Sequence, residues 1–268
     1  MMRWMNTGTT YCYDDVYNDV IYAGEFGFDG IELKYSRIKN KDINTIHILS
    51  REHGVKIGAI GALKISGDTD TTNYETDRLK QMLEVSSALE CGIIVVVPER
   101  IQHKESLNDI EEAFIQKLFQ YSEISKVFGI SLAVEITGFA DAVINDFYRG
   151  YELINHMNTD NVGIVFDLYH FMGMHEDIGK LKSIDKNKLY IVHVNDGFIP
   201  AQRGSYPDDE RVWPGDGEFP ISGILDQIKK TGQIIPYSME VYGKKPWQFS
   251  HRKCFEIAKD KWSNIINE

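Results

Sequence analysis

The hydrophobic pattern alternates along the whole chain between short strand-like runs and longer segments with helical periodicity. Strands are predicted at residues 4–7, 28–33, 55–62, 92–97, 130–136, 162–167, 189–194 and 234–241. Helices are predicted at residues 14–26, 41–53, 74–90, 106–128, 147–157, 179–184 (the weakest pattern), 221–230 and 247–266. Because parallel strands need crossover helices between them, this order predicts an α/β protein with a (β/α)8 TIM barrel.

Length and composition agree with one such barrel. The chain has 268 residues and shows no linker or low-complexity stretch, so residues 1–268 are predicted to form a single TIM-barrel domain. An apolar fraction of 43% can supply a sizeable core. The formal net charge of −11 argues against nucleic acid as a partner, because phosphate binding depends on clustered lysine and arginine.

The cysteines and the apolar runs bear on the cellular compartment. Cys12, Cys91 and Cys254 are far apart and form no Cys-x-x-Cys pair, which favours reduced thiols. The N-terminus lacks the apolar stretch of a signal peptide, and the most continuous apolar run, residues 93–97, is too short to span a bilayer. We therefore expect a cytoplasmic protein with no membrane partner.

Each of the last four predicted strands carries one potential metal ligand close to its C-terminal end: Glu135, Asp167, His193 and Glu240. Barrel enzymes build their active sites from the C-terminal ends of strands. Successive strand residues face opposite sides, so Glu135 shares a face with Ala133, and Asp167 shares one with Val165. This parity predicts that the four side chains point into the barrel and converge on one site.

The donor types predict a single divalent metal ion. Carboxylates buried near a barrel axis are costly unless they are paired or bind a metal. Carboxylate and imidazole donors without a thiolate suit Mn²⁺, Mg²⁺, Co²⁺ or Zn²⁺. Such an ion could bind the carbonyl and adjacent hydroxyl of a small polyol ketone and stabilise an enediolate, while carboxylates on either side move protons.

Each residue taken alone has a simpler interpretation. A strand-end glutamate is usually solvated or paired with a loop, and His193 could be a core histidine. His170 could pair with Asp167 across a turn, and Glu32 is as compatible with a structural role as with a catalytic one. The Gly-Asp-Gly stretch at residues 215–217 reads as a turn. The four strand ends together favour the metal site.

Four stretches resemble the xylose-isomerase-like barrel superfamily of sugar isomerases and epimerases: AVEITG at 133–138, VGIVFDLYHF at 162–171, IVHVND at 191–196 and SMEV at 238–241. Within this superfamily the chain looks most like the inosose isomerases (2-keto-myo-inositol isomerases). That closer likeness is carried by ERVWPGDG at 210–217 and DNVG at 160–163.

The resemblance implies a role for each candidate residue. The metal ligands would be Glu135, Asp167, His193 and Glu240. Glu135 and Glu240 would also form the proton-transfer pair. His170 and Arg211 would hold substrate oxygens, and Trp213 would line the pocket. Arg211 could equally form a loop ion pair with one of the neighbouring acids at 208–210. The implied partner is a small polyol ketone, an inosose or a ketose, and homo-oligomerisation is left open.

Two departures keep other functions open. Ketose 3-epimerases of the superfamily typically place proline after the first glutamate, whereas Ile136 follows Glu135 here. Residues 198–209 also differ from what a strict inosose isomerase would show. The alternatives are a ketose 3-epimerase or an aldose–ketose isomerase on the same site. A non-catalytic sugar-binding barrel is less favoured, as is an apurinic endonuclease, which would need more strand-end histidines and less negative charge.

Overall fold

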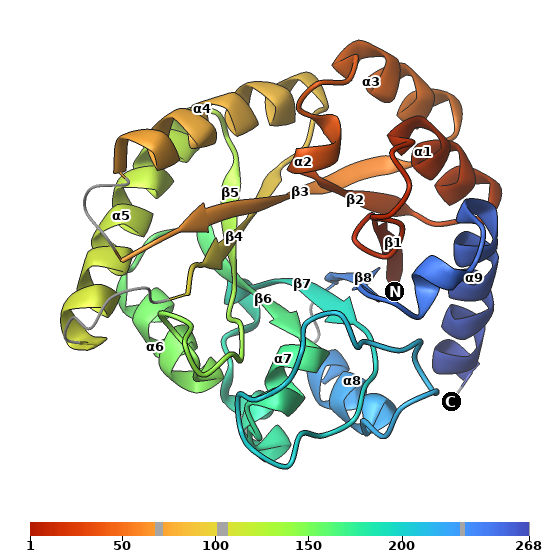
Figure 1. The fold of residues 1–268 in the computed structure, drawn as a ribbon. Helices are drawn as coiled ribbons and strands as arrows, with labels where there is room; N and C mark the ends of the chain where they lie inside the picture. Colours follow the sequence, from red (N-terminus) through yellow and green to blue (C-terminus); the bar gives the residue numbers. More distant parts are fainter. Residues whose placement is uncertain (68–71, 101–106, 231–233, 268) are drawn as a thin grey trace.

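Eight parallel strands form a closed barrel in the computed structural model, which describes residues 1–67, 72–100, 107–230 and 234–267. The strands are β1 (Met2–Asn6), β2 (Gly30–Lys34), β3 (Lys56–Ile65), β4 (Ile93–Pro98), β5 (Ser131–Glu135), β6 (Val162–Asp167), β7 (Leu189–Val194) and β8 (Pro236–Met239). Each strand pairs with its sequence neighbours, and β1 pairs with β8 to close the ring (Figure 1). The predicted (β/α)8 TIM barrel is confirmed.

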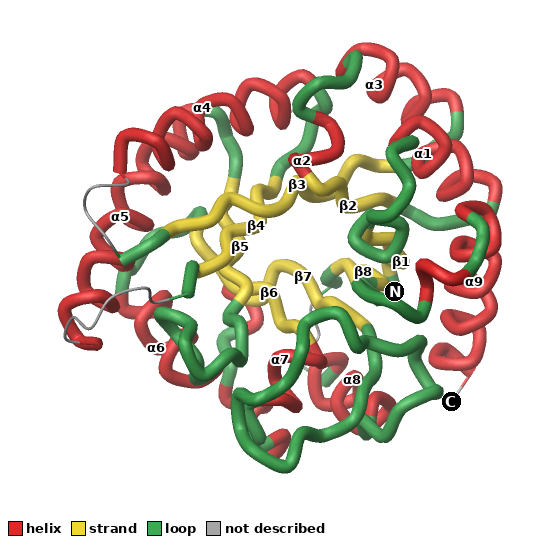
Figure 2. Tube along the Cα trace, in the orientation of Figure 1, coloured by secondary structure: helices red, strands yellow, loops and turns green. Residues whose placement is uncertain are grey.

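Helices surround the ring of strands, as the tube view shows (Figure 2). The α-helices are α1 (Val16–Glu25), α2 (Tyr35–Ile38), α3 (Ile43–Glu52), α4 (Thr72–Ala88), α5 (Leu107–Val127), α6 (Phe147–His156), α7 (Leu168–Gly173), α8 (Ile221–Lys229) and α9 (His251–Asn267). Short 3₁₀ helices are η2 (Ile178–Ser183), η3 (Lys186–Lys188) and η4 (Pro246–Gln248). None of the helices in the described ranges is long and apolar enough to cross a membrane.

The pattern analysis missed two short α-helices, and one predicted helix has a different form. All six residues of α7 are buried, so its sequence shows no alternation of apolar and polar positions from which a helix could be recognised. The four residues of α2 are too few to show a period. The segment predicted as a helix at 179–184 is the 3₁₀ helix η2, because α7 already begins the connection between β6 and β7.

The core has two parts, which lie on opposite faces of the strands. The larger part packs between the barrel and the helices. The smaller one consists of Trp4, Ala59, Val95, Ala133, Val165 and Ile191, which alternate with the outward-facing residues and fill the inside of the barrel. A Cβ atom on Gly58 would lie 2.2 Å from the Trp4 ring, so glycine is what lets this indole occupy the barrel interior.

This inner layer confirms the predicted parity. Ala133 and Val165 lie in the small inner cluster, and each is two residues before a strand-end acid. Side chains two positions further along the same strands therefore enter the barrel mouth. That the chain forms one domain over residues 1–268 stays a prediction, and homo-oligomerisation stays open.

Candidate active site

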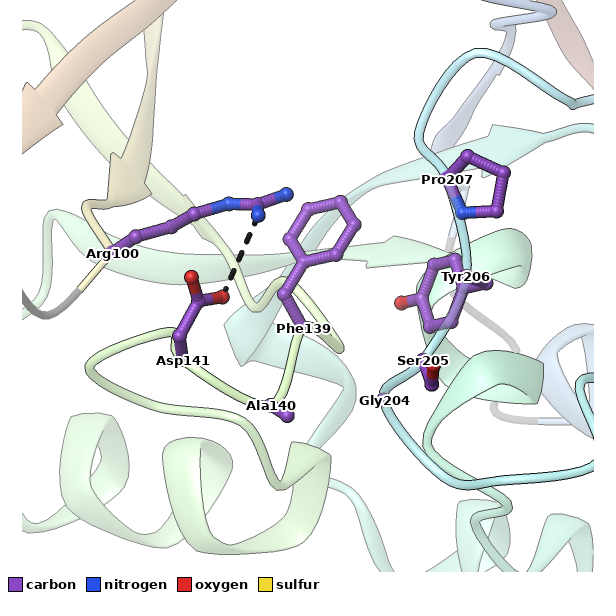
Figure 3. Close-up of a pocket in the computed structure, with 8 residues that line it drawn as sticks. All are labelled: Arg100, Phe139, Ala140, Asp141, Gly204, Ser205, Tyr206 and Pro207. Atoms are coloured by element: carbon purple, nitrogen blue, oxygen red, sulfur yellow. Dashed lines mark ion pairs between the residues drawn. The ribbon is translucent and has the colours of Figure 1, made fainter.

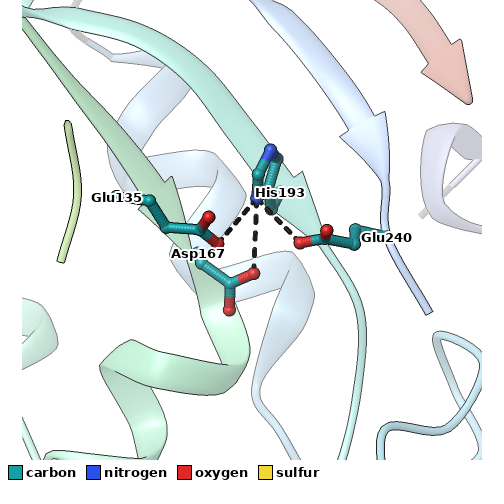
Figure 4. A group of neighbouring side chains, drawn as sticks. All are labelled: Glu135, Asp167, His193 and Glu240. Atoms are coloured by element: carbon teal, nitrogen blue, oxygen red, sulfur yellow. Dashed lines mark hydrogen bonds and ion pairs between the residues drawn. The ribbon is translucent and has the colours of Figure 1, made fainter. Parts of the chain in front are cut away.

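The four strand-end candidates converge at the C-terminal mouth of the barrel (Figure 4). Glu135 and Asp167 are the last residues of β5 and β6, His193 is the penultimate residue of β7, and Glu240 follows β8 directly. All four side chains are buried. We call these residues the strand-end group. One potential ligand atom from each lies within 4.8 Å of all the others.

His193 is the centre of the strand-end group, and its Nδ1 atom faces three carboxylates. That atom is 2.9 Å from Glu240 Oε2 and 3.1 Å from Glu135 Oε1. Asp167 Oδ2 lies 3.5 Å from the same atom. Glu135 and Glu240 approach the imidazole from either side (Figure 4). The group therefore presents three carboxylates and one ring nitrogen to a common point.

The carboxylates around His193 favour positive charge at the barrel mouth. Burial alone would lower the pKa of His193, but Glu32, Glu240 and Glu135 more than offset it and hold that pKa well above its ordinary value. Burial alone would raise the pKa of Glu240, but Lys34 and His193 lower that pKa well below its usual range. Arg211 likewise overcomes burial and lowers the pKa of Asp167 to about 2. Asp167 and Glu240 are thus ionised and stabilise a cation placed beside them.

The strand-end group fits a divalent ion. Glu240 Oε2 is a buried oxygen with no hydrogen-bond partner among the described residues, because His193 Nδ1 can serve only one of the carboxylates around it. A common ion about 2.0–2.4 Å from each donor fits within the 4.8 Å span. The site can therefore hold one divalent metal, with oxygen donors and one imidazole but no thiolate.

Glu32 supports His193 from the opposite side. Its Oε2 atom lies 3.0 Å from His193 Nε2 and accepts a hydrogen bond of 3.0 Å from Ser238 Oγ. Glu32 and His193 are both fully buried. A carboxylate on Nε2 holds the proton there, so Nδ1 is the nitrogen that would give up its proton to bind a metal. The geometry thus orients Nδ1 toward the three carboxylates.

We expect Glu32→Gln to weaken metal binding about 10- to 100-fold, because outer carboxylates raise the basicity of a metal-bound imidazole. Titration of Mn²⁺ or Zn²⁺ into the metal-free protein by calorimetry measures the effect. Ser238→Ala keeps the Glu32 charge while removing one of its hydrogen bonds, so a smaller change is expected. An unaltered dissociation constant in Glu32→Gln would contradict this role.

The Asp-x-x-His step has a local structural cause. Asp167 ends β6 and is the N-cap of α7, where its Oδ1 atom accepts a 2.9 Å hydrogen bond from the His170 backbone nitrogen. The cap places His170 in the first turn of α7, beside the Asp167 carboxylate. The spacing therefore couples a residue of the strand-end group to a second polar side chain at the barrel mouth.

His170 and Arg211 meet at this point. Arg211 Nη2 lies 3.2 Å from His170 Nε2, and a guanidinium can only donate, so His170 Nε2 accepts and Nδ1 carries the ring proton. The hydroxyl oxygen of Tyr206 accepts a 3.0 Å hydrogen bond from His170 Nδ1. Arg211 also pairs with Asp208 at 2.7 Å and lies 3.6 Å from Asp167 Oδ2. The sequence left open whether Arg211 forms a loop ion pair or lies at the site. In the structure Arg211 does both.

Trp213 is buried in the large core cluster, and its Nε1 atom has no hydrogen-bond partner in the described part of the chain. Its expected place in the pocket stays a prediction. The roles assigned from the resemblance to the strand-end group, His170 and Arg211 are likewise hypotheses, which the geometry makes concrete.

A cavity of about 490 Å³ is lined in part by Phe139 and Tyr206, both of which contact His170 (Figure 3). The Phe139 ring packs edge-on against His170, with centroids 5.2 Å apart. The guanidinium carbon of Arg100 lies over the Phe139 ring, 4.0 Å from its centroid. The Nη1 atom of Arg100 lies 3.6 Å from Asp141 Oδ1. Aromatic faces and charged groups thus border the barrel mouth on its β5 side.

The sequence analysis missed Lys34, which belongs to this site. It ends β2, two residues after Glu32, and its Nζ atom donates a 2.6 Å hydrogen bond to Glu240 Oε1. Glu32 and Lys34 share a face by strand parity, and this was the available signal. Asn195 was also missed; its Nδ2 atom donates to Asp167 Oδ2 at 3.0 Å.

Asp196 organises the loop that carries Arg211. Its buried carboxylate accepts four backbone hydrogen bonds, from Gly197, Gly215, Gly217 and Phe219, at 2.8–3.1 Å. An antiparallel bridge joins Asp196 to Val212. The Gly-Asp-Gly turn at 215–217 is therefore wrapped around an internal carboxylate.

Comparison with known proteins places this arrangement in a family. A model of the xylose isomerase-like TIM barrel matches residues 20–260. The chain belongs to this family. The family match confirms the resemblance seen in the sequence motifs.

Curated relatives of similar length are inosose isomerases. The enzyme of Halalkalibacterium halodurans is 27% identical over 98% of this chain and 95% of its own. That of Bacillus subtilis is 25% identical over 100% of this chain and 99% of its own.

Solved structures share the fold over the full length. The crystal structure of the IolI protein with a bound zinc atom superposes with a TM-score of 0.92 at 26% identity, covering 99% of this chain and 98% of that one. A D-psicose 3-epimerase solved with D-fructose has a TM-score of 0.80 at 14% identity, with 98% of both chains covered, which shows a common fold.

Proposed function

We propose that this protein is a divalent-metal-dependent isomerase or epimerase of a small polyol ketone, and that the ketone is an inosose. The observation that carries the proposal is the strand-end group, in which three carboxylates and one oriented imidazole surround a common point. The full-length similarity to inosose isomerases supports the substrate class. The zinc bound by the IolI protein supports the metal.

The proposed chemistry is proton transfer next to a ketone. Glu135 and Glu240 flank His193 from opposite sides (Figure 4), so a substrate at the mouth would have a carboxylate on each side. One carboxylate takes the proton from the carbon beside the ketone, the C–H electron pair forms a carbon–carbon double bond, and the ketone oxygen becomes negatively charged. A divalent ion held by the strand-end group supplies stabilisation of that charge.

The place to which the proton returns decides the product. A proton given to the opposite face of the same carbon yields an epimer. A proton given to the former carbonyl carbon, while the hydroxyl proton moves to the old ketone oxygen, shifts the ketone by one carbon. His170 and Arg211 lie next to Asp167 and would hold substrate oxygens through their hydrogen-bonding atoms.

An endonuclease function is less well supported. The strand-end group contains one imidazole and three carboxylates, whereas a histidine-rich zinc cluster was the feature expected of that class. The net charge of −11 also disfavours binding to a phosphate backbone.

Deuterium exchange tests the proposal. The purified protein with Mn²⁺ is incubated in D₂O with 2-keto-myo-inositol, D-fructose and D-psicose, and NMR follows each carbon-bound hydrogen. We expect metal-dependent exchange beside the ketone of 2-keto-myo-inositol, with a new isomer appearing, and loss of exchange with EDTA. Bound metal without exchange in any of the three ketones would contradict the proposal.

A further inference from the structure

One cation at the barrel mouth has no role in the chemistry described so far. Lys34 ends β2, and its side chain is about one-fifth exposed, in contrast to the buried carboxylate that it contacts. Its ammonium has three N–H donors, and among the described residues only Glu240 Oε1 accepts from it. Two donors therefore remain for another acceptor on the accessible side of Glu240.

The surroundings fix the side chain in this place. The Lys34 backbone nitrogen donates a 2.8 Å hydrogen bond to Thr7 Oγ1. A Cβ atom on Gly8 would lie 3.0 Å from Lys34 Cε and 3.2 Å from Glu240 Oε1, so the loop after β1 packs closely on both groups. Glycine at position 8 lets the ammonium lie beside the carboxylate, and a larger residue would press on it.

The division of Glu240 between two cations is informative. Its Oε1 atom is held by Lys34, while its Oε2 atom faces the strand-end group, 2.9 Å from His193 Nδ1. Lys34 thus orients one oxygen of Glu240 without occupying the oxygen that faces the strand-end group. A second cation, Arg211, lies 3.6 Å from the carboxylate of Asp167 in the same group. Two cations therefore lie beside carboxylates of the strand-end group, Lys34 at Glu240 and Arg211 at Asp167.

From this geometry we propose that Lys34 is a further catalytic residue, whose ammonium donates a hydrogen bond to the substrate oxygen that becomes negative when the adjacent carbon loses its proton. The inference rests on the proposed function and adds a residue to it. A fixed donor aimed at a developing oxyanion stabilises the transition state more than the ground state, since the charge is larger there. The lysine remains a cation throughout, and the proton moves between carbon and a carboxylate as described above.

This role differs from a structural one in its effect on the metal. If Lys34 only held the site together, its loss would weaken metal binding. If it serves the substrate, its loss removes a positive charge beside Glu240, and a divalent ion should bind as tightly as before or more tightly, because like charges repel. Metal affinity and turnover are therefore expected to move independently.

The test compares Lys34→Met with Lys34→Arg and with the matched control Lys64→Met, which removes a lysine from the exposed side of β3. Exchange in D₂O with Mn²⁺ and 2-keto-myo-inositol gives kcat and KM, and calorimetry gives the Mn²⁺ affinity of each metal-free variant. We expect Lys34→Met to lower kcat about 10²- to 10³-fold with a smaller change in KM. Its Mn²⁺ affinity should be unchanged or higher, Lys34→Arg should recover part of the rate, and Lys64→Met should match the wild type.

Other outcomes overturn the inference. A wild-type rate in Lys34→Met, or a joint loss of metal affinity and rate, would show that Lys34 is not catalytic. Absence of exchange in the wild type with every ketone of the panel would overturn the proposed function, and the role of Lys34 with it. Circular dichroism checks folding, and Lys34→Gln replaces Lys34→Met as the neutral variant if the latter does not fold.

Discussion

Glu135→Gln and Glu240→Gln are each expected to lower the rate of proton exchange about 10²- to 10⁴-fold or more, because an amide cannot act as the base. Both side chains flank His193 at about 3 Å and lie on opposite sides of the proposed substrate position. An amide oxygen can still ligate a cation, so part of the metal affinity should survive. The measurement is the rate of deuterium incorporation at saturating Mn²⁺.

Glu99→Gln is the matched control, since this acid follows β4 at the same end of the barrel but lies outside the strand-end group. Its rate should equal that of the wild type. If either active-site variant kept a wild-type rate with metal bound, the corresponding glutamate would be excluded from proton transfer.

His193→Ala and His170→Ala should separate metal binding from substrate handling. His193 provides the central nitrogen of the strand-end group, so its loss should lower the metal affinity by more than about 10²-fold and remove activity with it. The His170 side chain contacts Arg211 and Tyr206, and its backbone nitrogen donates a hydrogen bond to Asp167 Oδ1. Its loss should mainly raise KM while the metal remains bound.

Calorimetry with Mn²⁺ and steady-state kinetics distinguish the two variants. His156→Ala is a useful control, because this histidine ends α6, away from the strand-end group, and its Nδ1 atom contacts the Glu152 carbonyl oxygen. Comparable metal loss in His170→Ala and His193→Ala would contradict the separate roles.

The barrel could be predicted because each strand is a local pattern, and β6 and β7 were located to the residue. Strand parity also predicted correctly that the side chains of Glu135 and Asp167 point into the mouth, since alternation along a strand is a fixed geometric rule. The convergence of four strand ends then followed from closure of the sheet.

The remaining features depend on contacts between distant segments. Lys34 and Glu240 are 206 positions apart, and no local sequence pattern near either residue predicts their hydrogen bond. Tyr206 reaches His170 from a loop whose path is set by its own hydrogen bonds. α7 was missed because complete burial removes the polar face from which amphipathic helices are recognised.

The internal carboxylate of Asp196 has a consequence for the kind of ligand that this barrel selects. Many barrels use the backbone N–H groups after the seventh and eighth strands to grip a phosphate. Here the N–H groups of Gly215 and Gly217 already bind the Asp196 side chain. A phosphate approaching them would have to displace the covalently attached Asp196 side chain from both hydrogen bonds. These two N–H groups are therefore not available to a phosphate of a bound sugar.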